Sequence, residues 1–410
     1  MLTALRVRGF KSLTDVELRL PRMAVLFGPN ASGKSNILDA IQALSRIATS
    51  RTLSDALSEP IRGYPIEAFS FPTGGLSDLM EGSAATFSLE ADVSVDDEKF
   101  AYRAEVGIQP ASGTLAIRDE YLATLKKTGE VKGDPQIQRS GDVLRLRRKS
   151  SPGRPRNEEV GKNYALLSDL RLSGPEYRAI EKCRREFSEW RTYYLDPRVA
   201  MRTARPPAEV TDIGVLGENI APFLYRLRAE REKHFAALKR TVRSIIPSVQ
   251  DVDVDLDKRR GTLDIQVRQD GIDFSSRIVS EGTLRVLALC AIVVNPWSGS
   301  LLAFEEPENG VHPRRLELIA DLLTSLVEQK RQVIVTTHSP LFCNAALRHA
   351  RARPDEVALL QVSRYRGNTK ITPFDPAGPL FADAEIGKAL SSGNEDGLFE
   401  SLLLRGLIDA

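Results

Sequence analysis

The stretch that decides the fold runs from residue 28 to residue 35 and reads GPNASGKS. It matches the pattern G-x-x-x-x-G-K-S, whose glycines let backbone N–H groups curl around phosphate oxygens. We expect Lys34 to reach the β and γ phosphates of a nucleotide, and the Ser35 hydroxyl to ligate Mg²⁺. A strand pattern precedes this loop and a helical pattern follows it, which disfavours a chance glycine-rich loop. The expected phosphate-binding residues are Gly28, Pro29, Asn30, Ala31, Ser32, Gly33, Lys34, Ser35 and Asn36.

The bulk composition is typical of a soluble globular protein. Of 410 residues, 42% are hydrophobic and 27% are charged, and the net charge is +2. A nucleic-acid surface would therefore have to be local. The N-terminus has no apolar signal core, and the longest apolar run, residues 286–294, is too short to cross a bilayer. Three unpatterned cysteines suggest a reducing compartment, so we expect a cytoplasmic protein without membrane segments.

Hydrophobic periodicity predicts a mixed α/β chain. The segment 160–247 is expected to be mostly helical. The expected strands are 2–8, 16–27, several antiparallel strands within 60–125, 252–256, 261–269 and 332–338.

The stretch LLAFEEPENG, residues 301–310, runs from an apolar strand into three carboxylates. In a phosphate-binding-loop protein, such a strand end holds the second Mg²⁺ contact and positions the attacking water. We expect Glu305 to bind or orient Mg²⁺ through a water, and Glu306 to polarise the attacking water. Glu308 is assigned no chemistry, and a solvated turn is the alternative for the whole cluster.

Two weaker motifs flank this strand. His338 ends the strand VIVTTH, 32 residues after Glu306, where a sensor of the γ phosphate is expected; a structural histidine is the alternative. Ser280 and Gly282, within SEGT, open an apolar helix, which suits either an anion-binding helix start or an ordinary N-cap.

The order of these motifs resembles the ABC-type ATPase heads of the SMC, RecF and OLD group, AAA family ATPases of the AAA_21 kind. The resemblance rests on LRVRGFKSL at 5–13, LFGPNASGKSNILDAI at 26–41, VSEGTLRVLAL at 279–289, LLAFEEPENGVHP at 301–313 and VIVTTHSP at 333–340. It implies an α/β P-loop NTPase head with an antiparallel β subdomain and an inserted helical subdomain.

The implied organisation is one discontinuous head over residues 1–410. It comprises an N-terminal lobe with the P-loop and β subdomain (1–125), a basic loop (126–157), a helical insert (158–250) and a C-terminal lobe with the signature, acidic strand and switch histidine (251–410).

The resemblance also implies ATP and Mg²⁺ as cofactors and a homodimer, or a higher oligomer. In such heads the Ser-x-Gly signature contacts the γ phosphate held by a second subunit, so Ser280 and Gly282 would act in trans on ATP bound by residues 28–35 of the partner. Residues 309–312, NGVH, match the loop that crosses the dimer. Glu305 replaces the usual Asp and SEGT replaces the usual SGGQ, which narrows the resemblance to the OLD-like branch.

OLD nucleases continue past the histidine strand into a Toprim domain. Here the 72 residues after His338 do not supply the Toprim glutamate and D-x-D. The acidic alternation DVDVDLD at 251–257 is what a half-buried strand gives. We therefore expect DNA cutting, if any, to reside in a separate Toprim-like or toxin-like effector.

Contact with DNA is left open by the sequence. Residues 126–156 hold ten Lys or Arg against three acids, and Gly153–Arg156 resembles an AT-hook core; a solvated basic loop explains them equally well. Arg6, Arg8 and Lys11 form a second candidate surface.

The favoured function is a dimeric ATPase switch that gates an effector or acts on DNA, with defence against phage or plasmids as a candidate role. The alternative is a RecF-like repair or chromosome-maintenance ATPase. A self-sufficient nuclease lacks a recognisable cutting site. A transporter ATPase is disfavoured because the signature lies about 245 residues after the loop.

Overall fold

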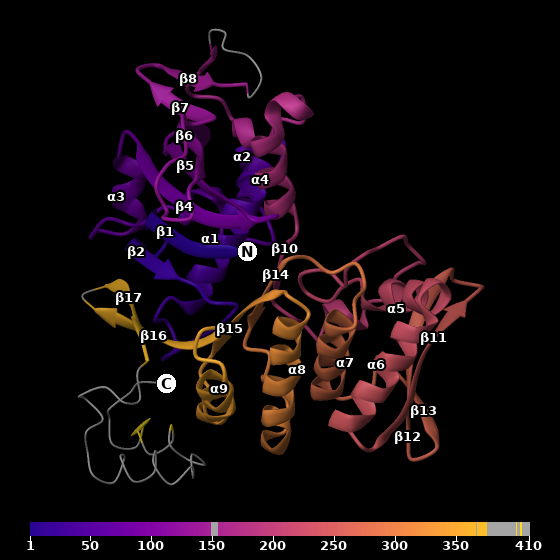
Figure 1. Ribbon diagram of the computed structural model, residues 1–410. Helices are drawn as coiled ribbons and strands as arrows, with labels where there is room; N and C mark the ends of the chain where they lie inside the picture. The colour runs from indigo at the N-terminus through magenta and orange to yellow at the C-terminus, as the bar shows by residue number, and fades with distance from the viewer. Residues whose placement is uncertain (149–154, 366, 375–398, 400–401, 404–410) are drawn as a thin grey trace. The chain divides into compact units, whose positions relative to one another are not determined.

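The computed structural model describes the whole chain except residues 149–154, 366, 375–398, 400–401 and 404–410. The chain forms two compact units, each built from several segments (Figure 1). The first comprises Met1–Pro21, Asn30–Trp190 and Val362–Thr372, and the second Arg22–Pro29, Arg191–Gln361 and Pro373–Ala410. The division of the head into the four expected segments stays a prediction.

The first unit is built on an eight-stranded antiparallel sheet in the order β2-β1-β4-β5-β6-β7-β8-β9. Its strands are β1 (Leu2–Phe10), β2 (Leu13–Arg19), β4 (Ala85–Val95), β5 (Glu98–Gln109), β6 (Thr114–Leu125), β7 (Ile137–Ser140), β8 (Val143–Leu146) and β9 (Arg156–Glu159). The helices α1 (Lys34–Ile47) and α4 (Arg178–Ser188) pack against β4 and each other. Two short helices, α2 (Leu53–Ala56) and α3 (Leu76–Glu81), precede β4. The antiparallel strands expected within 60–125 are confirmed.

The expectation of a basic loop over 126–157 is wrong for the described residues. Strands β7, β8 and the start of β9 lie there, because Ile137, Leu144 and Leu146 are buried at alternating positions between the charges. Gly141, at φ 65°, makes the turn between β7 and β8. Gly153 and Arg154 of the AT-hook-like stretch lie outside the described residues.

The second unit holds the parallel strands of a six-stranded sheet, in the order β10-β14-β15-β3-β16-β17. Strands β14, β15, β3 and β16 run parallel, and β16 continues into residues of the first unit. The bounds are β10 (Trp190–Tyr193), β14 (Leu301–Glu305), β15 (Gln332–Thr337), β3 (Met23–Phe27), β16 (Val357–Tyr365) and β17 (Asn368–Pro373). The strand expected over 16–27 is divided into β2 and β3 around Pro21, which has no N–H to donate to a ladder.

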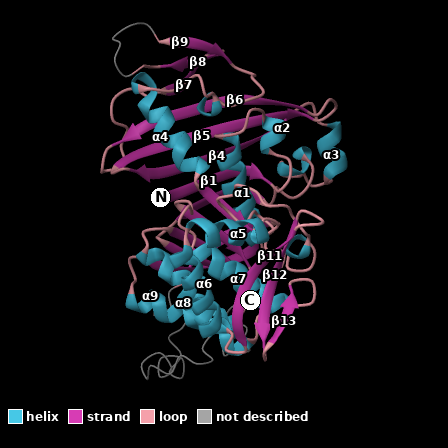
Figure 2. Cartoon of the chain, turned by 90° about the vertical axis from the view of Figure 1, so that its right-hand side faces the viewer, coloured by secondary structure: helices cyan, strands magenta, loops and turns pink. Residues whose placement is uncertain are grey.

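Helices cover this sheet and a smaller one. Helices α6 (Glu232–Ile245), α7 (Glu281–Val293), α8 (Leu316–Glu328) and α9 (Pro340–Ala352) lie side by side in that order (Figure 1). Helices α5 (Ile220–Glu230) and α6 pack on β11 (Val249–Asp257), which pairs with β12 (Thr262–Gln269) and then β13 (Ile272–Ser275) (Figure 2).

The strands expected at 252–256 and 261–269 are confirmed by β11 and β12. The segment 160–247 is helical in α4, α5 and α6, but it also contains β10, which joins the edge of the parallel sheet. Every helix among the described residues is too short or too polar to span a bilayer.

Candidate nucleotide site

The P-loop links a buried strand to a helix. All five residues of β3 are buried, and the strand leads directly into Gly28; α1 begins at Lys34. Within the loop, Ala31 and Gly33 have φ values of 62° and 106°, the left-handed region that turns successive N–H groups inward. Gly33 caps α1 without a side-chain hydrogen bond, and helix starts of this kind bind phosphate through backbone N–H groups.

The side chains of the loop fit a bound phosphate. The Ser32 Oγ is buried and has no hydrogen-bond partner among the described residues, so it can bond a ligand group that enters the loop. Lys34 is only 5% exposed, as expected for an ammonium group held inside an anion cradle. These surroundings match a nucleotide phosphate, and the half-buried Ser35 at the start of α1 is placed to ligate a metal beside it.

Two hydroxyls brace this loop from within the first unit. Thr369 Oγ1, on β17, donates to the Ser32 carbonyl at 2.9 Å and lies 2.8 Å from the Ser12 Oγ. The Asn36 amide donates to the same Ser12 Oγ at 2.8 Å. A Cβ on Gly33 would lie 2.1 Å from Thr369 Oγ1, so glycine is required there by this contact as well as by its φ. Sequence reasoning missed Ser12 and Thr369.

The predicted catalytic residues follow the carboxyl ends of neighbouring strands in the second unit. Phe304 on β14 is level with Val335 on β15, which is level with Val25 on β3. Because these strands are parallel, Glu306, His338 and Gly28 all leave the sheet at the same edge. This is the edge at which open α/β sheets bind their ligands.

The structure brings Glu306 and His338 together. The Glu306 Oε1 lies 2.9 Å from His338 Nδ1, and its Oε2 accepts a hydrogen bond of 2.6 Å from the Asn309 amide. Glu306 has a φ of 43°, an uncommon conformation for a residue with a side chain and one that is typical of functional turns. The carboxylate is thus fixed at both oxygens while about a quarter of its side chain stays exposed.

Ser280 and Gly282 begin α7 as expected, and both have partners inside this chain. Ser280 is the N-cap, and its Oγ accepts from the Thr283 N–H at 3.2 Å. A Cβ on Gly282 would lie 2.2 Å from the Gly310 carbonyl oxygen, so the two backbones can approach only because residue 282 is glycine. Gly282 therefore has a packing role that the sequence did not reveal.

Arg202 holds the segment that leads into this helix. Its guanidinium donates to the carbonyl oxygens of Ser276, Arg277 and Val279. Arg198, from the same irregular segment, forms an ion pair of 2.8 Å with Glu281. The segment after β10 therefore positions the signature.

The magnesium prediction rests on Ser35 and Glu305, which ends β14. The described residues contain no group of three or more His, Cys, Asp or Glu side chains arranged to hold a metal ion.

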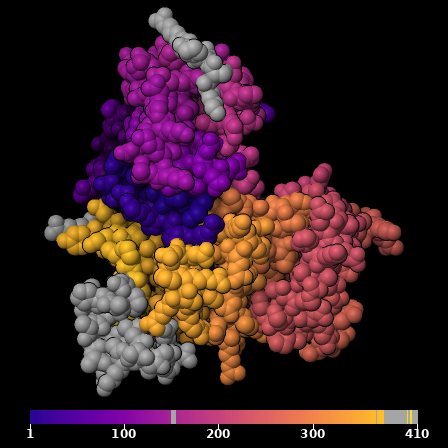
Figure 3. Space-filling model, viewed as in Figure 1, coloured from indigo at the N-terminus to yellow at the C-terminus, as the bar shows by residue number. Residues whose placement is uncertain are grey.

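The cations proposed as a DNA surface are largely paired. Arg6 bonds Glu90 and Asp92, Arg8 bonds Asp15, and Lys11 bonds the buried Asp39. In the basic segment, which Figure 3 shows in magenta on the first unit, the cations with acidic partners are Lys126, Arg147, Arg148 and Arg156. Those without a described side-chain partner are Lys127, Lys132 and Arg145.

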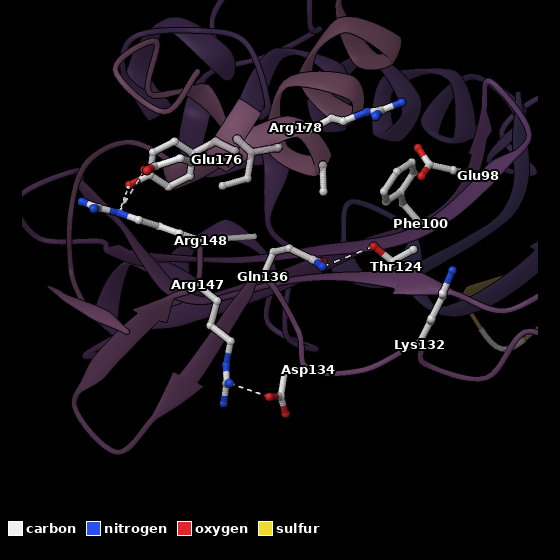
Figure 4. Close-up of a pocket in the computed structure, with 13 residues that line it drawn as sticks. Glu98, Phe100, Thr124, Lys132, Asp134, Gln136, Arg147, Arg148, Glu176 and Arg178 are labelled. Carbon is white, nitrogen blue, oxygen red and sulfur yellow. Dashed lines mark hydrogen bonds and ion pairs between the residues drawn. The ribbon is translucent and has the colours of Figure 1, made fainter. Parts of the chain in front are cut away.

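A cavity of about 360 Å³ in the first unit is separate from the predicted site. It lies between the strands of the sheet and the start of α4, with Phe100 and Ile180 among its lining residues. Figure 4 shows Gln136 in its middle, bonded to Thr124 at 3.2 Å, and Arg147 paired with Asp134 at its rim. None of the residues predicted to bind nucleotide or to catalyse lines it, although Lys132, Arg147 and Arg148 of the basic segment do.

Comparison with known proteins agrees with this geometry. The family model described as "AAA domain, putative AbiEii toxin, Type IV TA system", AAA_21, matches residues 23–344. The chain belongs to the AAA_21 family. The match spans the P-loop, the signature, the acidic strand and the histidine strand of this AAA_21 chain, so the expected ABC-type AAA ATPase head is confirmed.

One solved structure shares this fold, and two further solved heads are similar to a lesser degree. An SMC head bound to the C-winged helix domain of ScpA is similar with a TM-score of 0.54 at 14% identity, covering 91% of this chain and 98% of that one. The SMC head domain from Thermotoga maritima gives 0.44 at 16% identity, covering 91% and 99%. An SMC head with an extended coiled coil from Pyrococcus furiosus, bound to the C-terminal domain of ScpA, gives 0.46 at 14% identity, covering 96% and 99%. No curated protein matches the chain.

Proposed function

We propose that this AAA_21 chain binds ATP and Mg²⁺ and hydrolyses ATP as a dimeric switch that gates a partner effector. The observation that carries the proposal is the placement of Glu306, held between His338 and Asn309 at the edge where β3 enters the P-loop. A carboxylate fixed in this way can orient a water and accept its proton.

The chain's own residues divide the chemistry between them. The loop from Gly28 to Ser35 binds the phosphates, and Lys34 neutralises charge on the β and γ groups. Glu306 takes the proton of the attacking water, while His338 presents its second ring nitrogen, Nε2, to the water or the γ phosphate. Mg²⁺, held by Ser35 and by Glu305 through a water, would offset the charge that develops on the phosphate oxygens.

The exposed start of α7 supports the proposed dimer. Ser280 is exposed, so the start of α7 is accessible to the γ phosphate of ATP held by a second copy. ATP would then join two heads, and hydrolysis would separate them.

The proposal also concerns the kind of partner on which the chain acts. Because Arg6, Arg8 and Lys11 are paired, a separate effector protein, Toprim-like or toxin-like, is favoured over DNA as the output, and defence against phage or plasmids fits such a system. The second candidate, a RecF-like repair or chromosome-maintenance ATPase, shares the site and differs in taking DNA as its partner. Mass measurement of the chain co-purified with its co-expressed neighbours, with and without ATP, separates the two.

The activity is tested by steady-state ATP hydrolysis and ATP binding of the purified chain. Lys34→Ala should abolish both, because it removes the phosphate-binding ammonium group. Lys233→Ala, an exposed lysine on α6, is the matched control and should behave as wild type. Normal turnover by Lys34→Ala would rule out the P-loop assignment.

A further inference from the structure

The third carboxylate of the EEPE stretch is buried beside the predicted site. Glu308 is 5% exposed, although it lies in the turn that directly follows Glu305 and Glu306. Its Oε1 bonds the Thr337 hydroxyl, and its Oε2 is buried with no partner among the described residues. Burial raises the pKa of Glu308, and a buried carboxylate with one unsatisfied oxygen is costly unless a group binds it.

The residue that Glu308 holds is next to the sensor histidine. Thr337 Oγ1 accepts a hydrogen bond of 2.9 Å from the Ser339 N–H. The Thr337 hydroxyl therefore links the residue before His338 to the residue after it. The His338 Nδ1 in turn meets Glu306 at 2.9 Å. A shift of the Thr337 hydroxyl would therefore move the imidazole relative to the base.

The other end of Glu308 lies in the turn 306–311. The Glu308 carbonyl accepts from the Val311 N–H at 3.0 Å, and the Glu306 carbonyl accepts from the Asn309 N–H at 3.1 Å. The same turn carries Gly310, whose carbonyl packs against Gly282 at the signature. One short segment thus touches the base, the sensor strand and the start of α7.

We propose that Glu308 is a positioning residue that couples the turn 306–311 to His338 through the hydroxyl of Thr337. The inference rests on the proposed hydrolysis of ATP. It extends that function by one connection. Through this connection, a change in the expected dimer-crossing loop, residues 309–312, alters the alignment of His338 with Glu306.

The hydrogen bond between Glu308 and Thr337 can be removed from either side by a substitution of similar size. Thr337→Val removes the hydroxyl and keeps the shape, and Glu308→Leu removes the carboxyl and fills the space. Glu308→Gln keeps a neutral hydrogen-bonding group. The matched control is Thr336→Val on the same strand, since the Thr336 hydroxyl is buried without a described partner.

Thr337→Val and Glu308→Leu should each lower kcat at least about tenfold, with KM and the Kd for ATP within about twofold of wild type because the P-loop is untouched. The double variant should be no slower than the slower single variant, as expected for two parts of one connection. Glu308→Gln and Thr336→Val should stay close to wild type. Losses that add in the double variant, or a parallel loss of ATP affinity, would overturn the inference.

A second readout does not depend on hydrolysis. The imidazole resonances of His338 can be followed by NMR, because the chain has only four histidines and His338→Gln assigns the signal. Thr337→Val and Glu308→Leu should both move the His338 signal, and Thr336→Val should leave it in place. An unmoved signal refutes the coupling even if the chain hydrolyses ATP, and a moved signal supports it even if hydrolysis is not found.

Discussion

Thr369 Oγ1 donates a hydrogen bond to the carbonyl oxygen of Ser32, 2.9 Å away, across 337 positions of sequence. The carbonyl can only accept, so the one hydroxyl proton of Thr369 is committed to it. Ser12 must then donate to Thr369, and Asn36 donates to Ser12. These three hydrogen bonds tie the Ser32 carbonyl of the P-loop to β17, to the turn between β1 and β2 and to α1, and so stabilise the conformation of the loop.

Replacing Thr369 by valine should weaken ATP binding about tenfold, because the loop must then be ordered by the ligand. Isothermal titration with ATP and Mg²⁺ measures the change. Thr372→Val, on the same strand and without a described side-chain partner, is the matched control. An unchanged Kd for Thr369→Val would show that the loop holds its shape without the brace.

Glu306→Gln should reduce ATP hydrolysis by at least about 100-fold, since the amide cannot accept a proton. ATP binding should persist, and the ATP-bound chain should accumulate as a dimer in size-exclusion chromatography with light scattering. Glu232→Gln, an exposed acid at the start of α6, should hydrolyse at the wild-type rate. A Glu306→Gln chain that turns over ATP normally would assign the base elsewhere.

Gly282→Ala should destabilise the chain by roughly 1–3 kcal/mol, because the new methyl group meets a backbone carbonyl that cannot rotate away. The loss should appear in thermal unfolding without ATP, where no dimer is required. Gly107→Ala is the control, since its Cβ would meet only the flexible side chain of Arg118. Equal melting temperatures for Gly282→Ala and wild type would contradict the packing role and leave Gly282 to the phosphate contact alone.

The free energy of unfolding should fall as the pH rises through the range in which Glu120 is protonated in the folded chain but ionised in the unfolded chain. Glu120, on β6, is fully buried, and burial raises the pKa of its carboxyl from 4.5 to about 7. Between these values the folded chain keeps a proton that the unfolded chain has released, so the free energy of unfolding decreases, and it levels off above about pH 7. At ~1.4 kcal/mol per pKa unit, the loss is on the order of 3 kcal/mol.

Urea unfolding between pH 4.5 and 8 tests this dependence. Glu120→Gln should lose the downward slope, while also being less stable because its amide meets the N–H groups of Leu166 and Leu167. Glu105→Gln on β5 should keep the slope. Parallel pH profiles for wild type and Glu120→Gln would show that another group is responsible.

The features that could be predicted from the sequence are those whose functional residues lie close together in one short stretch. The P-loop, the acids after β14 and the histidine after β15 each combine a strand, a turn and a reactive side chain in one short stretch, and parallel pairing then brings their ends to one edge. The family and the head fold followed from the order of these stretches.

The features that the sequence did not reveal depend on partners distant in the sequence, or on an alternation of apolar residues that charged residues interrupt. Nothing near Thr369 indicates that it braces the P-loop, and Glu308 resembled a solvated turn residue until its burial and its bond to Thr337 were visible. In residues 126–157, arginines between the apolar positions obscured the alternation that builds β7 and β8. Charge composition predicted a loop there, whereas three buried aliphatic side chains determine the strands.

The close approach of Gly282 to Gly310 has a consequence for how such chains can change over evolution. A methyl group at position 282 would strike the carbonyl of residue 310, so the turn after the acids would have to be rebuilt in the same lineage. In an alignment of related chains, these two positions should therefore vary together. Their joint pattern would trace which relatives keep the signature helix seated on the turn beside the base.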